Sequence, residues 1–349
     1  MLILNQGIDM SNSLPVLQVR DLSVAFGFDK NGKPRDGIKP LQVTDRVSFD
    51  IYSGEFFALV GESGCGKSVT AMSILRLLPQ PSAQIVEGSV LYCAGENSAP
   101  LDLAKLPLEE LQKIRGSEIA CIFQEPMQAL NPVVSIKKQL MEIFRFCGRP
   151  NGDCMSVIRE QLALAGFKDI DRVLESYPHE LSGGMLQRVC IVMALLSKPK
   201  LIIADEPTTA LDVTVQAQVL AVLKDMAKRT GTAVLLITHN MGIVSQYADR
   251  VAVMYAGRIV ETGAVREVID SPMHPYTQGL LSAIPENHSD MRTMKSIPGS
   301  VPHPKDFVEG CRFADRCEKC LDQCRSAMLP PKQKAPGSTS HEANCFLLQ

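Results

Sequence analysis

Short runs of apolar residues alternate along the chain with longer segments in which apolar residues recur every three or four positions. Strands covered on both faces read as continuous apolar runs, and we expect such strands at Phe56–Val60, Ile119–Phe123, Leu201–Ala204 and Ala233–Thr238. The periodic segments predict helices at Lys67–Leu78, Ser135–Phe146, Val157–Ala165, Gly184–Ser197 and Val213–Lys228. This alternation predicts an α/β fold with a mainly parallel sheet.

Two parts of the chain depart from this pattern. Residues 101–182 read as mostly helical and interrupt the strand-rich parts, which predicts a helical subdomain. After about residue 271, proline, histidine and cysteine become frequent and regular periodicity fades. We therefore expect one domain over residues 1–270 and a cysteine-rich C-terminal extension over residues 271–349. Because that extension buries little apolar surface, it would need a metal ion or cluster to stabilise its fold.

Composition excludes several classes of protein. The 36 basic residues nearly balance the 38 acidic ones, so no strong field points to nucleic acid as a partner. The longest apolar stretches, such as Val189–Leu196, are far shorter than the roughly 20 residues of a membrane-spanning helix. The stretch Met1–Leu14 has no basic start followed by a long apolar run, so we expect no secretory signal and a cytoplasmic chain.

The strongest chemical signal is a glycine-rich loop between a predicted strand and a predicted helix. Residues 61–68 fit the P-loop pattern G-x-x-x-x-G-K-[ST]. Glycines let successive backbone N–H groups point at phosphate oxygens, and the following helix adds the positive end of its dipole. An ordinary glycine-rich turn is the alternative, which the strand–loop–helix setting disfavours. We expect nucleotide contacts from Gly61, Glu62, Ser63, Gly64, Cys65, Gly66, Lys67, Ser68 and Val69.

Four side chains, two in that loop and two at the end of a later strand, have the chemistry of phosphate hydrolysis. Lys67 would neutralise the β- and γ-phosphates of ATP, and the Ser68 hydroxyl would ligate Mg²⁺. The apolar strand Leu201–Ala204 is followed by Asp205, which would hold Mg²⁺, and by Glu206, which would polarise the attacking water. The alternative is that the two carboxylates only open a loop or cap a helix.

A third motif narrows the class of protein. The residues from Leu181 to Arg188 resemble the signature sequence of ABC ATPases, shortly before the Asp205–Glu206 strand, as in that family. Physically, the motif is a serine and two glycines at a helix N-terminus, which is an anion site. The resemblance implies that the nucleotide bound by a second cassette is contacted by Ser182, Gly183, Gly184 and Gln187.

Further residues stand in the order of the same family. The resemblance implies that Gln124 contacts Mg²⁺ and senses membrane subunits, that Asp212 couples the two sites and that His239 touches the γ-phosphate. Phe26 occupies the usual place of the aromatic that stacks on adenine, at the end of the apparent first strand Val16–Ala25, although Phe28 competes for the role. Glu206, His239 and Gln124 are thus the expected catalytic residues.

Three longer stretches resemble the oligopeptide and dipeptide importer branch of ABC transporters, namely Phe123–Pro132, His274–Pro285 and Gly310–Cys317. This resemblance implies an ATPase at the cytoplasmic face of a bacterial inner membrane that energises peptide import. It also implies three kinds of partner: a second ABC ATPase subunit, two membrane permease subunits and a periplasmic or extracellular substrate-binding protein. We expect a heterodimer of ATPases, while a homodimer is chemically possible.

The cysteines of the extension match the same branch. Its members are similar to proteins that carry a [4Fe-4S] cluster in this region, which implies ligands from Cys311, Cys317, Cys324 and Cys345. Four thiolates would equally satisfy tetrahedral Zn²⁺, so the residues alone leave the metal open. Cys320 departs from the branch pattern and could compete as a ligand.

Other functions remain open at this point. Related importers carry nickel, glutathione or sugars, and other ABC ATPases act on ribosomes or in DNA repair. A metal- or redox-sensing module, in which the cysteines regulate the ATPase, is a further alternative.

Overall fold

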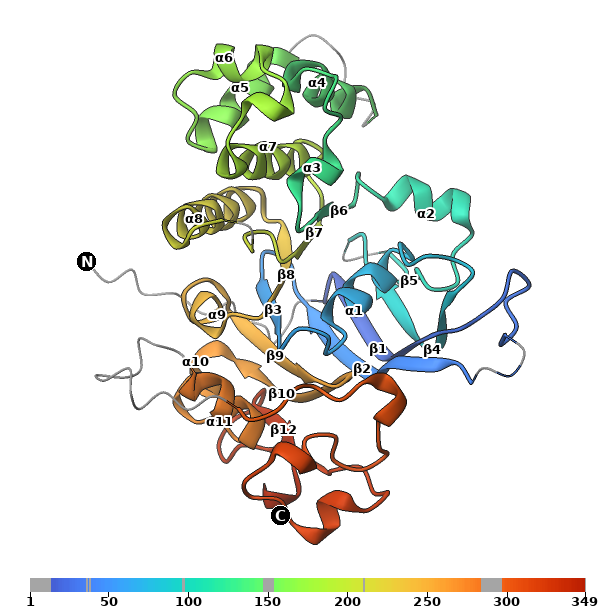
Figure 1. Ribbon diagram of the computed structural model, residues 1–349. Coiled ribbons are helices and arrows are strands. Elements are labelled where there is room, and N and C mark those ends of the chain that lie inside the picture. The colour runs from blue at the N-terminus through green and yellow to red at the C-terminus, as the bar shows by residue number, and fades with distance from the viewer. Residues whose placement is uncertain are drawn as a thin grey trace.

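The computed structural model describes residues 14–35, 37, 39–95, 98–146, 154–209, 211–283 and 297–348 (Figure 1). The prediction of a missing secretory signal and the last two residues of the stretch His274–Pro285 lie outside the described residues. Among the helices in these ranges, none is long and apolar enough to cross a membrane.

A mixed sheet forms the centre of the molecule. In the described ranges it has eight strands in the order β11-β12-β10-β9-β3-β8-β7-β6. Five neighbouring strands are parallel: β9 (Arg250–Tyr255), β3 (Phe56–Val60), β8 (Ala233–Thr238), β7 (Leu201–Asp205) and β6 (Ile119–Ile122). The edge beyond β9 is antiparallel and consists of β10 (Arg258–Ala264), β12 (Glu342–Asn344) and β11 (Lys332–Lys334). The predicted parallel sheet is confirmed, with an antiparallel edge added.

Burial on both faces explains why the parallel strands read as continuous apolar runs. Successive side chains of a strand point to opposite faces. In β3, Phe56, Ala58 and Val60 face one hydrophobic core, whereas Phe57 and Leu59 face another. Every residue of β3 is therefore buried, as are all those of β7 and β8.

A second sheet was not expected from the sequence. Its four described strands are antiparallel in the order β2 (Leu41–Ile51), β1 (Leu17–Phe26), β4 (Ala83–Tyr92) and β5 (Leu101–Asp102). Only its first strand was predicted, as Val16–Ala25. The burial patterns of β2 and β4 mix buried and exposed positions, so these strands have no continuous apolar run. This sheet and the central sheet enclose the second core with α1 (Lys67–Ile74).

A group of helices lies toward one end of the molecule (Figure 1). They are α3 (Pro126–Ala129), α4 (Ile136–Phe146), α5 (Cys154–Leu164), α6 (Ile170–Glu175), α7 (Gly183–Leu196) and α8 (Val213–Thr230). Residues of α4 to α8 belong to the first core. The predicted helical range 101–182 also contains β5, β6 and α2 (Leu108–Ile114). Helix α1 stops short of its predicted end because the chain turns at Arg76, whose φ is 52°. The helices α9 (Met241–Tyr247), α10 (Val265–Asp270) and α11 (Pro275–Ser282) also contribute buried residues to this core.

Residues 297–348, called here the C-terminal segment, lie at the opposite end of the molecule from α4–α6 (Figure 1). The segment has short 3₁₀ turns at Pro304–Asp306, Ala314–Arg316, Asp322–Arg325 and Phe346–Leu348. Its strand β12 pairs with β10, so the segment extends the central sheet. The loss of regular periodicity in the sequence corresponds to these short turns.

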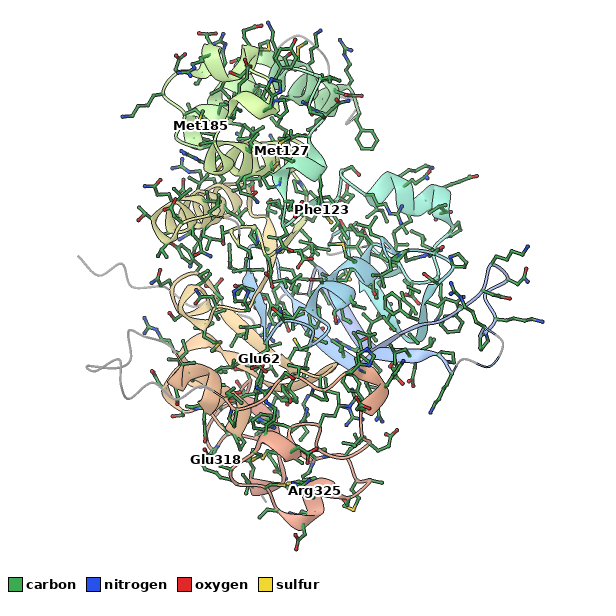
Figure 2. All side chains as sticks on the ribbon, viewed as in Figure 1. Glu62, Phe123, Met127, Met185, Glu318 and Arg325 are labelled. Carbon is green, nitrogen blue, oxygen red and sulfur yellow. The ribbon has the colours of Figure 1, made fainter. Side chains whose placement is uncertain are left out.

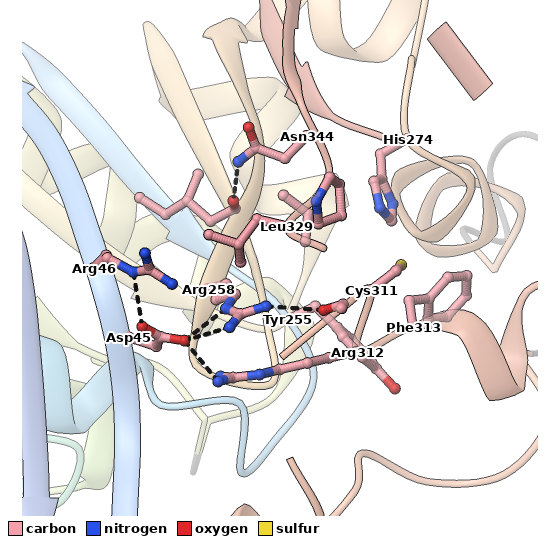
Figure 3. A pocket seen from close by; sticks show the side chains of 14 residues that line it. Asp45, Arg46, Tyr255, Arg258, His274, Cys311, Arg312, Phe313, Leu329 and Asn344 are labelled. Carbon is pink, nitrogen blue, oxygen red and sulfur yellow. Dashed lines mark hydrogen bonds and ion pairs between the residues drawn. The ribbon is translucent and has the colours of Figure 1, made fainter. Parts of the chain in front are cut away.

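Asp45 of β2 connects the second sheet to the C-terminal segment (Figure 3). Its carboxylate Oδ2 accepts from Arg258 Nε at 2.7 Å and from Arg312 Nη2 at 2.7 Å. Both arginines and Asp45 are largely buried. Burial alone would raise the pKa of Asp45, but the arginine charges outweigh it and hold this pKa below its ordinary value. The ion pairs thus stabilise the fold only while Asp45 is ionised.

We predict that Asp45→Asn lowers the free energy of unfolding by about 3 kcal/mol at neutral pH, because two buried arginines lose their partner. A group with a lowered folded-state pKa contributes stability above its unfolded pKa of about 4, and loses it as pH falls below that value. Urea unfolding between pH 7 and pH 3 should therefore show a smaller loss of stability in Asp45→Asn than in the wild type.

The exposed Asp225, paired with Arg229, offers the control Asp225→Asn. Equal pH dependence in all three proteins would contradict the assignment.

Candidate phosphate and nucleotide site

The predicted catalytic residues follow neighbouring parallel strands. Gly61 comes after β3, His239 after β8, Asp205 and Glu206 end β7, and Gln124 follows β6. Because these strands are parallel and adjacent, their carboxyl ends meet at one edge of the sheet. Ligands of open α/β sheets bind at such an edge. The topology therefore brings these five positions to one side of the molecule.

The glycines of the P-loop meet a steric requirement. A Cβ atom on Gly61 would lie 2.1 Å from the carbonyl oxygen of Met254 on β9, so the loop packs too closely on that strand for any side chain. Gly64 and Gly66 have φ of 82° and 107°, in the left-handed region that favours glycine. Gly66 is also the N-cap of α1. These glycines therefore allow the tight backbone turn that leads from β3 into α1.

Lys67 is buried at the centre of the loop. Its ammonium donates to the carbonyl oxygens of Gly61 at 2.8 Å and Glu62 at 3.0 Å, and lies 3.9 Å from Glu206 Oε1. Only 4% of this side chain is exposed. Cys65 is buried beside it, and burial raises the pKa of its thiol. The positive charge is therefore directed into the loop and faces a carboxylate of another strand.

Ser68 and Asp205 form the expected magnesium position. The Ser68 hydroxyl donates to Asp205 Oδ1 at 2.9 Å. Burial raises the pKa of Asp205, and the neighbouring charge of Glu206 raises it further, although the Ser68 bond and Lys67 oppose this. A buried carboxylate next to a second carboxylate gains from a cation, and a hydroxyl with a carboxylate suits the oxygen preference of Mg²⁺. These residues therefore fit a magnesium ion.

Glu206 is held between the strands β7 and β8. Its Oε2 accepts from the Thr209 hydroxyl at 2.9 Å and lies 3.3 Å from His239 Nδ1. Its φ of 45° is uncommon for a residue other than glycine, and such conformations concentrate at functional sites. The Glu206 side chain is 14% exposed and that of His239 is 48% exposed. One carboxylate thus connects Lys67, Thr209 and His239.

Other predicted residues of the site are exposed or only partly buried. Ser63 is exposed, and Val69 is partly buried against the second core. Gln124 is exposed just after β6, and no hydrogen bond joins it to Asp205 or Ser68 in the described residues. Phe26 is partly buried against the same core, whereas Phe28 is 7% exposed. Phe26 is therefore the more accessible of the two aromatic candidates.

The signature residues have local structural partners. Ser182 is the N-cap of α7 and accepts from the Met185 N–H at 3.4 Å. A Cβ on Gly184 would lie 2.4 Å from Val215 Cγ1, because α7 packs closely on α8. Gln187 is buried, and its Nε2 atom has no hydrogen-bond partner in the described structure. Asp212 caps α8 by accepting from the Val215 N–H. Gly183 at the start of α7 is exposed.

The signature and the P-loop of one chain lie apart. Met185 of the signature and Glu62 of the P-loop are well separated in Figure 2. No described hydrogen bond or ion pair joins residues 182–187 to residues 61–68. The structure thus brings together the P-loop, Asp205, Glu206 and His239, but leaves the signature outside that group.

Sequence reasoning missed the contacts of two site residues. Thr209 was not among the predicted site residues, yet its hydroxyl donates to Glu206 Oε2 at 2.9 Å. The Glu62 carboxylate is bound by Arg316 of the C-terminal segment, and this pair was not predicted. No local pattern indicates this pair, because 254 positions separate its members.

The expected iron–sulfur cluster and its zinc alternative are wrong. In the described part of the chain, no group of three or more His, Cys, Asp or Glu residues is arranged to hold a metal ion. Burial raises the pKa of Cys311 to about 12 and also raises the pKa of Cys317 and Cys345. Cys324 packs with Ala314 and Phe346 in a small apolar cluster that Cys311 and Cys320 also contact. Cys324 and Cys345 are buried, and Cys311, Cys317 and Cys320 are partly buried.

Comparisons with known proteins agree with this geometry. Residues 44–209 match the family model described as "ABC transporter", and residues 260–324 match "Oligopeptide/dipeptide transporter, C-terminal region". The chain is 45% identical over 335 residues to the oligopeptide transport ATP-binding protein AppD of Bacillus subtilis, which covers 96% of this chain and 97% of that protein. It is 44% identical over 337 residues to the dipeptide transport ATP-binding protein DppD of the same species, covering 95% and 94%.

A solved structure supports the fold. The dimeric, post-hydrolysis structure of the ATP-binding cassette MJ0796 bound to ADP and Pi superposes with a TM-score of 0.58 at 26% identity, covering 72% of this chain and 99% of that one. The expected ABC ATPase fold and the expected family resemblance are both confirmed. The chain belongs to the ATP-binding subunits of the oligopeptide/dipeptide family of ABC transporters.

Proposed function

We propose that this chain binds and hydrolyses ATP to energise a bacterial importer of peptides. The observation that carries the proposal is the meeting of Lys67, Asp205 and Glu206 at one sheet edge. The names of relatives that match almost the whole chain support peptides as the cargo. The cassette then acts from the cytoplasmic face of the inner membrane.

The residues of the site divide the work of hydrolysis. Lys67 donates to the β- and γ-phosphate oxygens in place of the Gly61 and Glu62 carbonyls it now contacts. Glu206 polarises the attacking water, while Thr209 and His239 hold its carboxylate in place. When bound by Ser68, Asp205 and Gln124, Mg²⁺ would neutralise charge on the phosphates. Phe26 stacks on the adenine.

The signature serves the nucleotide of a second cassette. Its separation from the P-loop of its own chain supports this arrangement, as does the dimeric state of the solved cassette. Ser182, Gly183, Gly184 and Gln187 would reach across the interface, and Asp212 would couple the two sites. We propose a heterodimer of two ATPase subunits on two membrane permeases, with a substrate-binding protein outside the membrane.

The proposal also divides the chain into two parts. We propose that residues 1–270 form the ATPase domain, with a helical subdomain at about residues 101–182, and that residues 271–349 form an extension to it. In its described residues the C-terminal segment has 3₁₀ turns and two short strands but no α-helix, which supports an extension distinct from the ATPase domain.

The function is tested by uptake of a labelled tripeptide into cells that lack the chromosomal copy of this subunit. Wild-type protein should restore uptake, and Glu206→Gln should not. Restored ATPase activity without any peptide uptake would contradict peptide import. Uptake of nickel or glutathione in the same cells would identify a different cargo.

We predict that Glu206→Gln retains ATP binding but loses hydrolysis about 10²- to 10⁴-fold, because the amide cannot accept the proton of the attacking water. Phosphate release by the assembled transporter measures the effect. Glu87→Gln changes an exposed glutamate of β4 and should leave turnover unchanged. Undiminished turnover in Glu206→Gln would remove this residue as the base.

We predict that Lys67→Ala weakens MgATP binding at least tenfold, since hydrogen bonds from a charged donor contribute about 1.5–3 kcal/mol. Isothermal titration calorimetry on the full chain measures the dissociation constant. Lys105→Ala removes a lysine that is 78% exposed and serves as the control. Wild-type affinity in Lys67→Ala would contradict the phosphate site.

A further inference from the structure

Glu62, the second residue of the P-loop, is held by parts of the chain that are distant in sequence. Its carboxylate receives two parallel hydrogen bonds from Arg316, at 2.6 Å from Nη1 and 3.0 Å from Nη2. Its backbone N–H donates to the Tyr276 hydroxyl of α11 at 2.9 Å. Figure 2 shows Glu62 beside the C-terminal segment. Both contacts come from outside the nucleotide-binding loop and its neighbouring strands.

The Arg316 side chain is held by several hydrogen bonds besides those to Glu62. Its guanidinium also donates to the carbonyl oxygens of Pro298, Ile297 and Gly299 and to the Tyr255 hydroxyl. The side chain is only 8% exposed. A planar guanidinium with every donor engaged has little freedom, so its bidentate pair specifies both distance and orientation. Arg316 therefore fixes the position of Glu62 relative to the C-terminal segment.

The surrounding aromatic rings make this contact rigid. Tyr255 of β9, Tyr276 of α11 and Phe313 of the C-terminal segment pack together, with ring centroids 4.6 to 5.4 Å apart. Arg316 lies 5.7 Å from the Tyr255 ring centroid. Tyr276 is fully buried. The sheet, α11 and the C-terminal segment thus meet at the P-loop as one packed unit.

The Glu62–Arg316 pair is connected to the phosphate site through the backbone of Glu62. The carbonyl oxygen of Glu62 accepts from Lys67, five positions further on. A shift of Glu62 would therefore move one of the two carbonyls that orient the Lys67 ammonium. Gly61 cannot absorb such a shift toward β9, because a Cβ there would already lie 2.1 Å from the Met254 carbonyl oxygen.

We propose that Arg316 is a positioning residue for the nucleotide site. By holding Glu62, it keeps the P-loop backbone in the shape that binds phosphate, so MgATP affinity depends on the docked C-terminal segment. This inference rests on the proposed function, because it assigns a determinant of affinity to the same ATP site.

The test is a double-mutant cycle on the full chain, with the MgATP dissociation constant measured by isothermal titration calorimetry. Arg316→Gln should raise this constant about tenfold, the effect of losing a hydrogen bond to a charged group. Glu62→Gln should raise it to a similar extent, and the double variant should be no weaker than either single variant. The matched control is Arg325→Gln, which breaks the exposed Arg325–Asp315 pair of the same segment and should leave the constant unchanged.

Thermal unfolding without nucleotide shows which variants are folded at the assay temperature. If Arg316→Gln does not fold, Glu62→Gln decides the matter, because it removes the same pair and leaves the C-terminal segment intact. Wild-type affinity in the folded pair variants would overturn the proposal. Additive losses in the double variant, or an equal loss in Arg325→Gln, would also overturn it.

Lys67→Ala, measured in the same series, separates this proposal from the proposed function. If Lys67→Ala binds MgATP with wild-type affinity, the ATP site itself is misassigned. If Lys67→Ala loses affinity while Arg316→Gln and Glu62→Gln do not, only the positioning role of Arg316 fails.

Discussion

The nearly buried ammonium of Lys67 is the constraint on which the site depends. A buried charge is costly unless oxygens surround it, and here the oxygens come from the Gly61 and Glu62 carbonyls and from Glu206. Those carbonyls can converge only because Gly61, Gly64 and Gly66 allow the backbone to turn so tightly. Glu206 can face them only because β7 and β3 are parallel and both flank β8. Sheet order, loop conformation and catalytic charge are therefore parts of one arrangement.

Two of the ion pairs that connect the C-terminal segment to the cassette join residues very distant in sequence. Arg312 pairs with Asp45 across 267 positions, and Arg316 pairs with Glu62 across 254 positions. The first pair stabilises the second sheet, and the second lies on the nucleotide loop. Contacts of such large sequence separation require the closure of long loops, which costs conformational entropy. The segment is consequently part of the folded ATPase in structural terms, although its own turns are short and irregular.

Some features could be predicted from the sequence because their causes are local. The strands β3 and β8 were predicted with their observed bounds, since burial on both faces makes every residue apolar. The P-loop and the carboxylates Asp205 and Glu206 could be predicted because they stand at the ends of apolar strands.

Other features could not be predicted from local patterns. The second sheet has no continuous apolar run in β2 and β4, so it was missed. The Glu62–Arg316 pair depends on tertiary packing. The iron–sulfur prediction failed because the spacing of cysteines along the chain does not reveal whether their side chains converge on one point, and in the described residues they do not.

The central claim is that ATP hydrolysis in this cassette drives solute across a membrane through partner subunits. Its most direct test is purification of the tagged chain from its native membranes in mild detergent, with partners identified by mass spectrometry. The account predicts two permease subunits with several membrane spans and a second ATP-binding subunit, at equal stoichiometry. A chain recovered only from the aqueous fraction, without any membrane partner, would contradict it.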